Sequence, residues 1–283
     1  MSDSPLGPKP TKAYKNQSFL SSREGRAIRI QCELGETEAR LNAHNIEGTV
    51  LFFGSARSKT KAQFDATMKE MHAKGEDTVR FQKTEWMCEV HEKLTALAAK
   101  VATFLASEAT FKNIGVLTGG GPGMMEAANQ GAFSVNPSRS IGMGISLPFE
   151  PSLNPYVHPD LAFEFHYFFT RKFWMVLQAT ALVVAPGGVG TMDELFEVMT
   201  LQQCGKAKVK FPIILFGKHY WDNVCNWQFM ADMGTVSQSD VDALFITDSV
   251  DEAFEKIVEG LRAQVEAGTL HGPVTDNSDK RFY

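Results

Sequence analysis

The amino-acid sequence predicts an α/β fold: a doubly wound parallel sheet of the Rossmann-like type, with helices on both faces. Two observations carry this prediction. Apolar segments of strand length alternate with amphipathic segments of helical period from about residue 48 onward, a pattern typical of a parallel sheet covered on both faces. Glycine-rich turns follow three of the apolar segments, at positions 54, 119–123 and 187–190. Because such sheets bind ligands at the carboxyl ends of their strands, we expect the functional site at these turns.

Each expected strand is a short apolar run that stops at a turn. Strands are expected over residues 49–53, 114–117, 141–147, 181–185, 212–216 and 243–246, and residues 161–165 are a further short candidate. The segments between them carry apolar residues at helical spacing. Helices are therefore expected over residues 85–106, 124–132, 170–179, 192–203, 220–230 and 250–267.

The chain divides into three parts. We expect residues 1–47 to form an N-terminal arm with short helices that pack on the domain, residues 48–267 to form the Rossmann-like domain that carries the functional site, and residues 268–283 to form a polar tail. Residues 58–80 are charged and interrupted by glycine, which predicts a surface excursion or an irregular helix. The roles of the arm and of residues 58–83 stay open.

Composition excludes several classes of protein. The 283 residues are 43% hydrophobic and 22% charged, as in globular proteins. A net charge of −5, without a basic run, argues against a nucleic-acid partner. No apolar run approaches the ~20 residues that span a bilayer, and no signal peptide is recognisable, so we expect a cytoplasmic protein with no membrane partner. The four cysteines are widely spaced, with no Cys-x-x-Cys and no metal-ligand cluster, so neither a metal nor a cofactor is expected.

Two of the glycine-rich turns have the form of phosphate-binding loops. Each joins an apolar strand to a helix, where unpaired N–H groups and the helix dipole favour an anion. The alternative is that the glycines only permit tight turns. Met124 stands where the dinucleotide fingerprint needs glycine, and no Walker motif occurs. A mononucleotide or sugar phosphate therefore fits better than a dinucleotide or nucleoside triphosphate.

Charged residues beside these loops have two interpretations each. Thr170 is expected to cap a helix, which would put Arg171 and Lys172 in the first turn, against the helix dipole. A bound anion or ion pairs with surface carboxylates would explain them. Glu194 is the last residue of a Thr191-x-x-Glu194 capping box. Its carboxylate either serves that cap or points at a ligand.

Four segments together resemble a known family. They are Pro-Gly-Gly-Val-Gly-Thr-Met-Asp-Glu at 186–194, the Arg171–Lys172 pair 23 residues before Glu194, Gly-Ser-Ala-Arg at 54–57, and Gly-Gly-Gly-Pro-Gly-Met-Met-Glu-Ala at 119–127. They are similar to the lonely-guy family of cytokinin-activating phosphoribohydrolases, often labelled lysine decarboxylase-like, over about residues 48–260. The resemblance implies a homodimer that hydrolyses the N-glycosidic bond of a nucleoside 5′-monophosphate without a metal. It implies Arg171 and Glu194 as the catalytic pair.

The expected phosphate and nucleotide contacts follow the same motifs. They are Gly54, Ser55, Gly120, Gly121, Lys172, Gly187, Gly188, Gly190 and Thr191. Glu126 is either an acceptor for a ribose hydroxyl or a solvated residue of a first helical turn, and His166 either donates to a base or packs among aromatic residues. Many relatives carry Met-His-Glu before the Arg-Lys pair, whereas this chain has Phe168, Phe169 and Thr170. The base, cytokinin or AMP-like purine, therefore stays open.

Three functions are compatible with these residues. The first is the hydrolase, an N-glycosidase that forms free base and ribose 5-phosphate. The second is a non-catalytic carrier of a nucleotide or phosphorylated cofactor, such as a pterin-type cofactor, for which Glu194 would be unnecessary. The third is another sugar-phosphate enzyme, such as a transferase. Lysine decarboxylation is not favoured, because it needs a lysine for a pyridoxal phosphate Schiff base and the strand-end loops offer only Lys172.

Overall fold

A computed structural model describes residues 9–147, 152–207 and 209–270 of the chain. They contain a seven-stranded sheet in the order β4-β3-β2-β1-β5-β6-β7, and every neighbouring pair of strands is parallel. The strands are β1 (Gly48–Phe53), β2 (Ile114–Thr118), β3 (Ser140–Ile145), β4 (Ala162–Phe165), β5 (Ala179–Val184), β6 (Ile213–Phe216) and β7 (Leu244–Thr247). The predicted fold class is confirmed, and so is the strand at 161–165.

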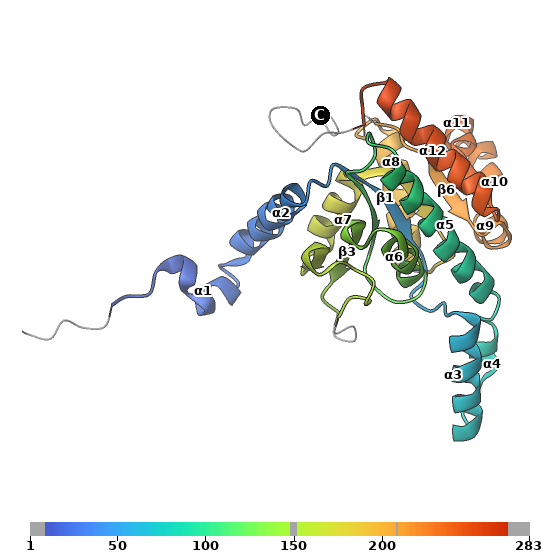
Figure 1. The fold of residues 1–283 in the computed structure, drawn as a ribbon, viewed down its shortest axis with the longest axis horizontal. Helices are drawn as coiled ribbons and strands as arrows, with labels where there is room; N and C mark the ends of the chain where they lie inside the picture. The colour runs from blue at the N-terminus through green and yellow to red at the C-terminus, as the bar shows by residue number, and fades with distance from the viewer. Residues whose placement is uncertain (1–8, 148–151, 208, 271–283) are drawn as a thin grey trace, which may run out of the picture.

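Helices connect the strands and surround the sheet (Figure 1). They are α1 (Gln17–Ser21), α2 (Arg26–Ala43), α3 (Lys61–Lys74), α4 (Val79–Gln82), α5 (Met87–Ser107), α6 (Met124–Val135), α7 (Phe168–Leu177), α8 (Val189–Gln203), α9 (Lys218–Val224), α10 (Trp227–Asp232), α11 (Gln238–Asp242) and α12 (Val250–Glu266). Short 3₁₀ turns occur at Ala13–Lys15, Pro137–Arg139 and Pro159–Leu161.

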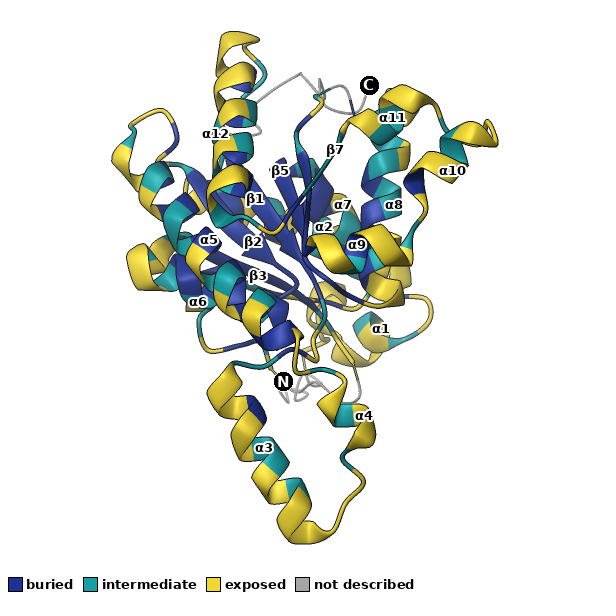
Figure 2. Cartoon of the chain, turned by 90° about the vertical axis from the view of Figure 1, so that its right-hand side faces the viewer, coloured by how far each residue is buried: buried dark blue, intermediate teal, exposed yellow. Residues whose placement is uncertain are grey.

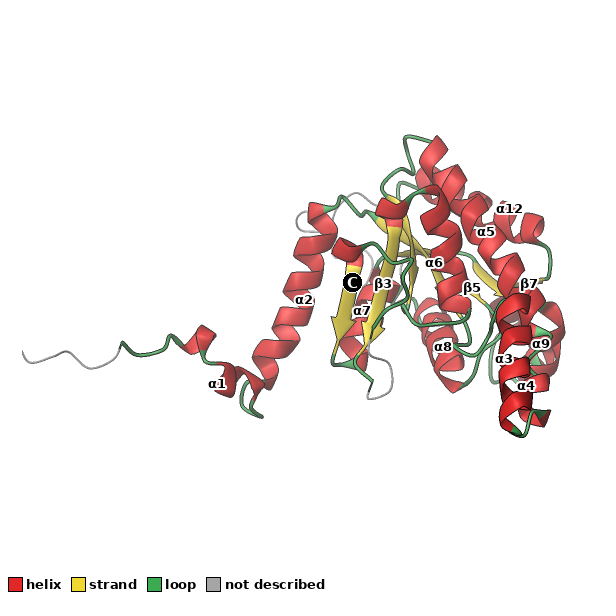
Figure 3. Ribbon diagram, turned by 60° about the horizontal axis from the view of Figure 1, so that its bottom comes forward, coloured by secondary structure: helices red, strands yellow, loops and turns green. Residues whose placement is uncertain are grey.

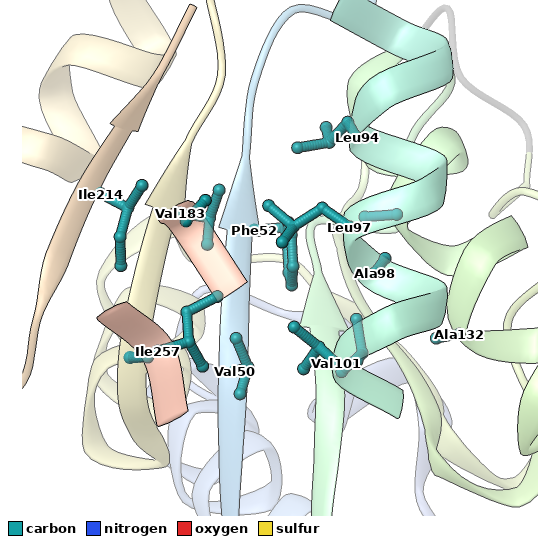
Figure 4. Close-up of a cluster of buried hydrophobic side chains, with 14 of the residues drawn as sticks. Val50, Phe52, Leu94, Leu97, Ala98, Val101, Ala132, Val183, Ile214 and Ile257 are labelled. Carbon is teal, nitrogen blue, oxygen red and sulfur yellow. The ribbon is translucent and has the colours of Figure 1, made fainter. Parts of the chain in front are cut away.

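The sheet has a separate apolar core on each face. Val50 and Phe52 of β1 pack with α5, α6 and α12 on one face, and Figure 4 shows Leu94, Leu97 and Val101 of α5 meeting these strand residues. Leu51 and Phe53 point to the other face, where α2, α7, α8, α9 and α10 contribute side chains. Side chains of a strand alternate between faces, so a strand buried on both faces is apolar throughout.

The order of the strands reverses at β1. From β1 the chain builds outward through β2, β3 and β4, and then returns to place β5 on the other side of β1. The loops after β1 and β5 therefore lead to connections that run in opposite directions. This is the switch in strand order at which open α/β sheets bind ligands.

Two segments leave the main body. The chain from α1 into α2 projects on one side, and α3 with α4 projects on another, with mostly exposed surfaces (Figures 1 and 2). The α3–α4 excursion is regular: Thr60 and Gln63 form a capping box at the start of α3. Phe64 and Phe81 stack with ring centroids 4.7 Å apart. Of the two expectations for this segment, the surface excursion agrees with the structure, and its helix α3 is regular rather than irregular.

Some expected elements differ from the structure. The helix expected over 220–230 is two helices, because the Asn226 side chain accepts a hydrogen bond from Phe229 N and starts α10 anew. α2 has 18 residues and is not short. It lies along the β4 edge of the sheet (Figure 3), where Arg40 Nη1 donates to the Ala162 carbonyl at 2.7 Å. Residues 1–8 of the expected arm and 271–283 of the expected tail lie outside the described residues. The division into domains stays a prediction.

Candidate active site

A cavity of about 560 Å³ opens at the carboxyl ends of the strands. Its described walls come from the ends of β1, β2, β3 and β4 and from the N-terminal parts of α6, α7 and α8. Its lining residues include Gly54, Ser55, Gly119, Gly121, Met125, Leu147, Leu153, Glu164, Phe168, Arg171, Gly188, Gly190, Thr191, Asp193 and Glu194. The structure thus brings together most of the predicted site residues, from four separate segments.

The first wall is the glycine turn that starts α8. Gly188 is the N-cap, and α8 has no side-chain cap among the described residues. The first N–H groups of an α-helix have no partner within the helix, so those of α8 lie at the cavity wall formed by Gly188, Gly190 and Thr191. Gly187 lies behind the wall, where a Cβ would come 2.0 Å from Thr191 Oγ1. The Tyr220 hydroxyl donates a hydrogen bond to the Gly187 carbonyl and holds the turn.

Of the two interpretations of Glu194, the capping box is wrong. Thr191 is the third residue of α8 rather than its N-cap, because the helix begins earlier, at Val189. Glu194 therefore lies in the second turn, out of the capping position. Helix capping therefore does not explain the position of the Glu194 carboxylate.

The loops after β1 and β2 are tied to this turn through Ser55. Its N–H donates to the Pro186 carbonyl at 2.9 Å, and its carbonyl accepts from Met124 N, also at 2.9 Å. Gly54 has no room for a side chain, because a Cβ would lie 2.5 Å from Met124 Cβ. One residue thus connects the strand ends of β1 and β5 with the start of α6.

Buried asparagines that the sequence did not single out fix the loop after β2. Asn154 Nδ2 lies 3.1 Å from the carbonyl oxygens of both Gly120 and Gly121, and 3.0 Å from Asn129 Oδ1. Gly120 has φ +71°, a backbone conformation that favours glycine. It lies behind the cavity wall, which Gly119 and Gly121 form. A loop asparagine carries no sequence pattern that could have indicated this role.

Arg171 is buried at the middle of the cavity wall. α7 begins at Phe168 with Tyr167 as N-cap, so the expectation that Thr170 caps the helix is wrong and Arg171 is the fourth helical residue. Arg171 Nε donates to the Met143 carbonyl at 2.7 Å, and Nη1 lies 3.7 Å from Glu194 Oε1. A Cβ on Gly119 would come 2.6 Å from Arg171 Nη2. The bare glycine therefore makes room for the guanidinium.

Glu194 is the most unusual group of the site. It is 5% exposed, and its Oε2 has no hydrogen-bond partner among the described residues. Burial raises the pKa of Glu194 to about 7, although Arg171 and Lys172 lower it. Buried polar atoms of native proteins are nearly always hydrogen-bonded, so an unsatisfied carboxylate oxygen at a cavity wall marks a site for a ligand.

Lys172 lies behind the wall, between α7 and α8. Its Nζ is 2.6 Å from Asp193 Oδ2, 2.9 Å from Glu197 Oε2 and 3.9 Å from Glu194 Oε2. Burial alone would lower the pKa of Lys172, but hydrogen bonds to Asp193 and Glu197 raise it, so it stays a cation. This geometry matches the ion-pair interpretation of Lys172. Its contact with phosphate stays a prediction.

Three further residues concern the site: two that the sequence suggested and one that it did not. Glu126 and His166 are absent from the described lining of the cavity, and the suggested ribose contact of Glu126 remains untested. Glu164, which the sequence did not indicate, lines the far end; it faces Gly144 in the register of β3 and β4 and accepts a hydrogen bond from Ser146 Oγ at 2.8 Å. Its place at the end of a short strand was the only available signal.

The described residues hold no group of three or more His, Cys, Asp or Glu side chains that could bind a metal ion. Among them there is also no helix whose length and apolar character would let it cross a bilayer.

Comparisons with known proteins agree with the motifs. Residues 125–257 match the family model described as "Possible lysine decarboxylase". A cytokinin riboside 5′-monophosphate phosphoribohydrolase of Mycobacterium marinum is 34% identical over 91 residues, which are 32% of this chain and 48% of that protein. The chain is thus similar to this family of phosphoribohydrolases, as its motifs indicated. The match spans about half the length of the curated relative.

The solved structures that resemble this chain have lower sequence identity. A molybdenum cofactor carrier protein from Chlamydomonas reinhardtii is 16% identical, with 76% of this chain and 99% of that chain covered and a TM-score of 0.46. A molybdenum cofactor binding protein from Rippkaea orientalis is 20% identical, with 62% and 88% covered and a TM-score of 0.40. These likenesses are too low to bear on function.

The first prediction concerns the stability cost of the buried carboxyl group. A folded-state pKa of about 7, raised from 4.5, means that ionising Glu194 destabilises the fold, so stability is lost as pH rises from about 4.5 to 7. At about 1.4 kcal/mol per pKa unit, the cost is roughly 3 kcal/mol. Glu194→Gln cannot ionise and should melt at a higher temperature than wild type at pH 8, but not at pH 4.5.

Thermal melts of both proteins from pH 4.5 to 8 measure this difference, with Glu259→Gln on α12 as the control for loss of an exposed carboxylate. A difference in Tm that stays constant with pH would contradict the assigned burial cost.

The second prediction concerns the room left for Arg171. Gly119→Ala places a methyl group within 2.6 Å of Arg171 Nη2 and 2.8 Å of Met125 Sδ. Both are ends of flexible side chains, so the fold should persist while the guanidinium moves. A misplacement of about 1 Å can cost 10²-fold in rate, so the rate of a reaction that uses Arg171 should fall by about that factor. Gly35→Ala in α2, where nothing lies within 4 Å, is the matched control; equal turnover of the two variants would exclude the assigned role of Gly119.

Proposed function

We propose that the protein hydrolyses the N-glycosidic bond of a purine or cytokinin nucleoside 5′-monophosphate to free base and ribose 5-phosphate. The observation that carries the proposal is the carboxyl group of Glu194, which is buried at the cavity wall with Oε2 unsatisfied. It lies one helical turn from the glycine-rich start of α8. A purely structural carboxylate in this position would find a hydrogen-bond donor in the protein.

The α8 end of the cavity suits the phosphate. The first N–H groups of α8 and the positive end of its dipole favour an anion there. Gly188 and Gly190 have no Cβ, so a ligand can come close to their backbone. The family relative acts on a 5′-monophosphate, as its name states, which supports this orientation.

The opposite end suits the base. From α8, beside β5, the cavity continues past the ends of β1, β2 and β3 to Glu164 on β4. Met125, Leu147 and Leu153 provide apolar walls on the way. Glu164 would repel a phosphate, but its carboxylate can accept a hydrogen bond from an exocyclic amine of a base. This favours a 6-aminopurine over a 6-oxopurine.

The ribose would then lie at Arg171 and Glu194. Cleavage breaks the bond between C1′ and the base nitrogen, the electron pair leaves with the base, and the sugar becomes oxocarbenium-like. The ionised carboxylate of Glu194 stabilises this cation and accepts a proton as water attacks C1′. The base takes up a proton from solvent. The guanidinium of Arg171 stabilises the ionised form of Glu194 and can hold sugar or phosphate oxygens.

We also propose that two copies of the chain form a homodimer. Phe168 and Phe169 are 53% and 57% exposed on α7, next to the cavity that Phe168 also lines. Adjacent exposed aromatic side chains are typical of a surface that binds another protein. A homodimer joined through this face would place the partner beside the active site.

The third prediction tests the proposal with purified protein and a panel of nucleotides. AMP and cytokinin riboside 5′-monophosphates should release free base, measured by chromatography, and AMP should react faster than IMP. Adenosine should react far more slowly than AMP, because phosphate binding at α8 contributes energy that lowers the barrier.

Adenosine turned over as fast as AMP would contradict the assignment of the phosphate end. Tight binding of nucleotides without any release of base would contradict the hydrolase and support the carrier.

A further inference from the structure

The helix that carries Arg171 begins without a capping side chain of its own. Among the described residues, Tyr167 at the N-cap of α7 makes no side-chain cap and the first turn of α7 holds no acidic residue. Arg171 places a cation close to the positive end of the helix dipole, which is unfavourable. The start of α7 therefore needs negative charge from another element.

Glu33 of α2 supplies this charge. Its Oε1 accepts a hydrogen bond from His166 N at 2.8 Å, and its Oε2 accepts one from the Thr170 hydroxyl. His166 directly precedes the N-cap, and Thr170, 1% exposed, directly precedes Arg171. One carboxylate thus contacts both sides of the first turn of α7.

α2 holds Glu33 firmly in this place. Residues 29, 33, 37 and 40–41 recur at helical spacing and share one face of α2. On this face Thr37 and Leu41 are 2% and 1% exposed. Arg40 donates to the Ala162 carbonyl at 2.7 Å, and its guanidinium carbon lies 4.2 Å from the ring centroid of Phe163. α2 is therefore packed on β4, the strand that leads into α7.

We propose that Glu33 is a positioning residue of the active site: its carboxylate fixes the first turn of α7 and so holds the Arg171 guanidinium beside Glu194. The inference rests on the proposed function in that Arg171 and Glu194 are taken to carry the reaction. It gives the N-terminal helix a function, although α2 lies outside residues 125–257 that match the family model.

The fourth prediction compares Glu33→Ala with Glu38→Ala, which removes the same charge from the same helix. Among the described residues, Glu38 makes no hydrogen bond or ion pair to α7. Glu33→Ala should lower kcat for AMP by about 10- to 100-fold, the scale of a small misplacement of a reacting group, while KM changes by less than about threefold. Glu33→Gln keeps one acceptor oxygen and should fall between. Equal kcat values for Glu33→Ala and Glu38→Ala would overturn the inference.

A second readout needs no turnover. The charged groups around Glu194 are Arg171 and Lys172 on α7 and Asp193 and Glu197 on α8. Arg171 lowers the pKa of Glu194, so loosening Arg171 should raise that pKa further. Tm of Glu33→Ala should then fall more steeply than that of wild type between pH 5 and 8.

This extra pH dependence should disappear when Glu194→Gln is added, because its source is the carboxyl group of Glu194. Its persistence in the double variant, or its absence from Glu33→Ala, would overturn the inference. If the chain hydrolyses no nucleotide, the proposed function fails, but these melts still decide whether Glu33 sets the contact between Arg171 and Glu194.

Discussion

The buried pairing of Arg171 with Glu194 is the interaction on which the candidate active site depends. Their side chains are 10% and 7% exposed, with Nη1 and Oε1 3.7 Å apart. At this separation the attraction does not offset the burial of the carboxyl group, whose pKa stays raised to about 7. The fold therefore holds a carboxyl group in an environment that costs stability. Such a cost is typical of functional sites, where groups are kept ready for a ligand rather than satisfied by the protein.

Several distant segments keep this pair in place. The Met143 carbonyl of β3 anchors Arg171 Nε at 2.7 Å, and Gly119 leaves the space that the guanidinium fills. Ser55 connects the loops after β1 and β5 with the start of α6. Glu33 reaches the first turn of α7 from the N-terminal helix. Parallel sheets make this convergence simple, because the carboxyl ends of all strands meet at one edge.

The sequence predicted the sheet well, and the glycine turns that it indicated line a cavity at the strand ends, because both features follow from strong local patterns. Continuous apolar runs mark strands buried on both faces, and glycine turns mark their carboxyl ends. The starts of α7 and α8 were predicted too late in the chain. Thr170 and Thr191 have the chemistry of caps, but Tyr167 and Gly188 occupy the N-cap positions of α7 and α8.

Contacts between distant segments could not be predicted in the same way. Glu33 and Asn154 act on loops far away in the sequence, and no spacing rule relates them to their partners. Glu164 lies on a strand too short to show a clear alternation. The ion pairs of Lys172 with Asp193 and Glu197 are a further example, because successive residues of a helix point in different directions and its neighbour Arg171 gave no indication of them.

The catalytic role of the Glu194 carboxylate is the central claim, and the kcat of Glu194→Gln with AMP tests it most directly. Glutamine keeps the size and one acceptor oxygen of the side chain but cannot carry the negative charge that an oxocarbenium-like state needs. We predict that kcat falls by about 10²-fold or more, the scale of losing one positioned electrostatic or acid–base group, while the Kd of AMP measured by calorimetry changes little. Hydrolysis at a rate close to wild type would contradict the account.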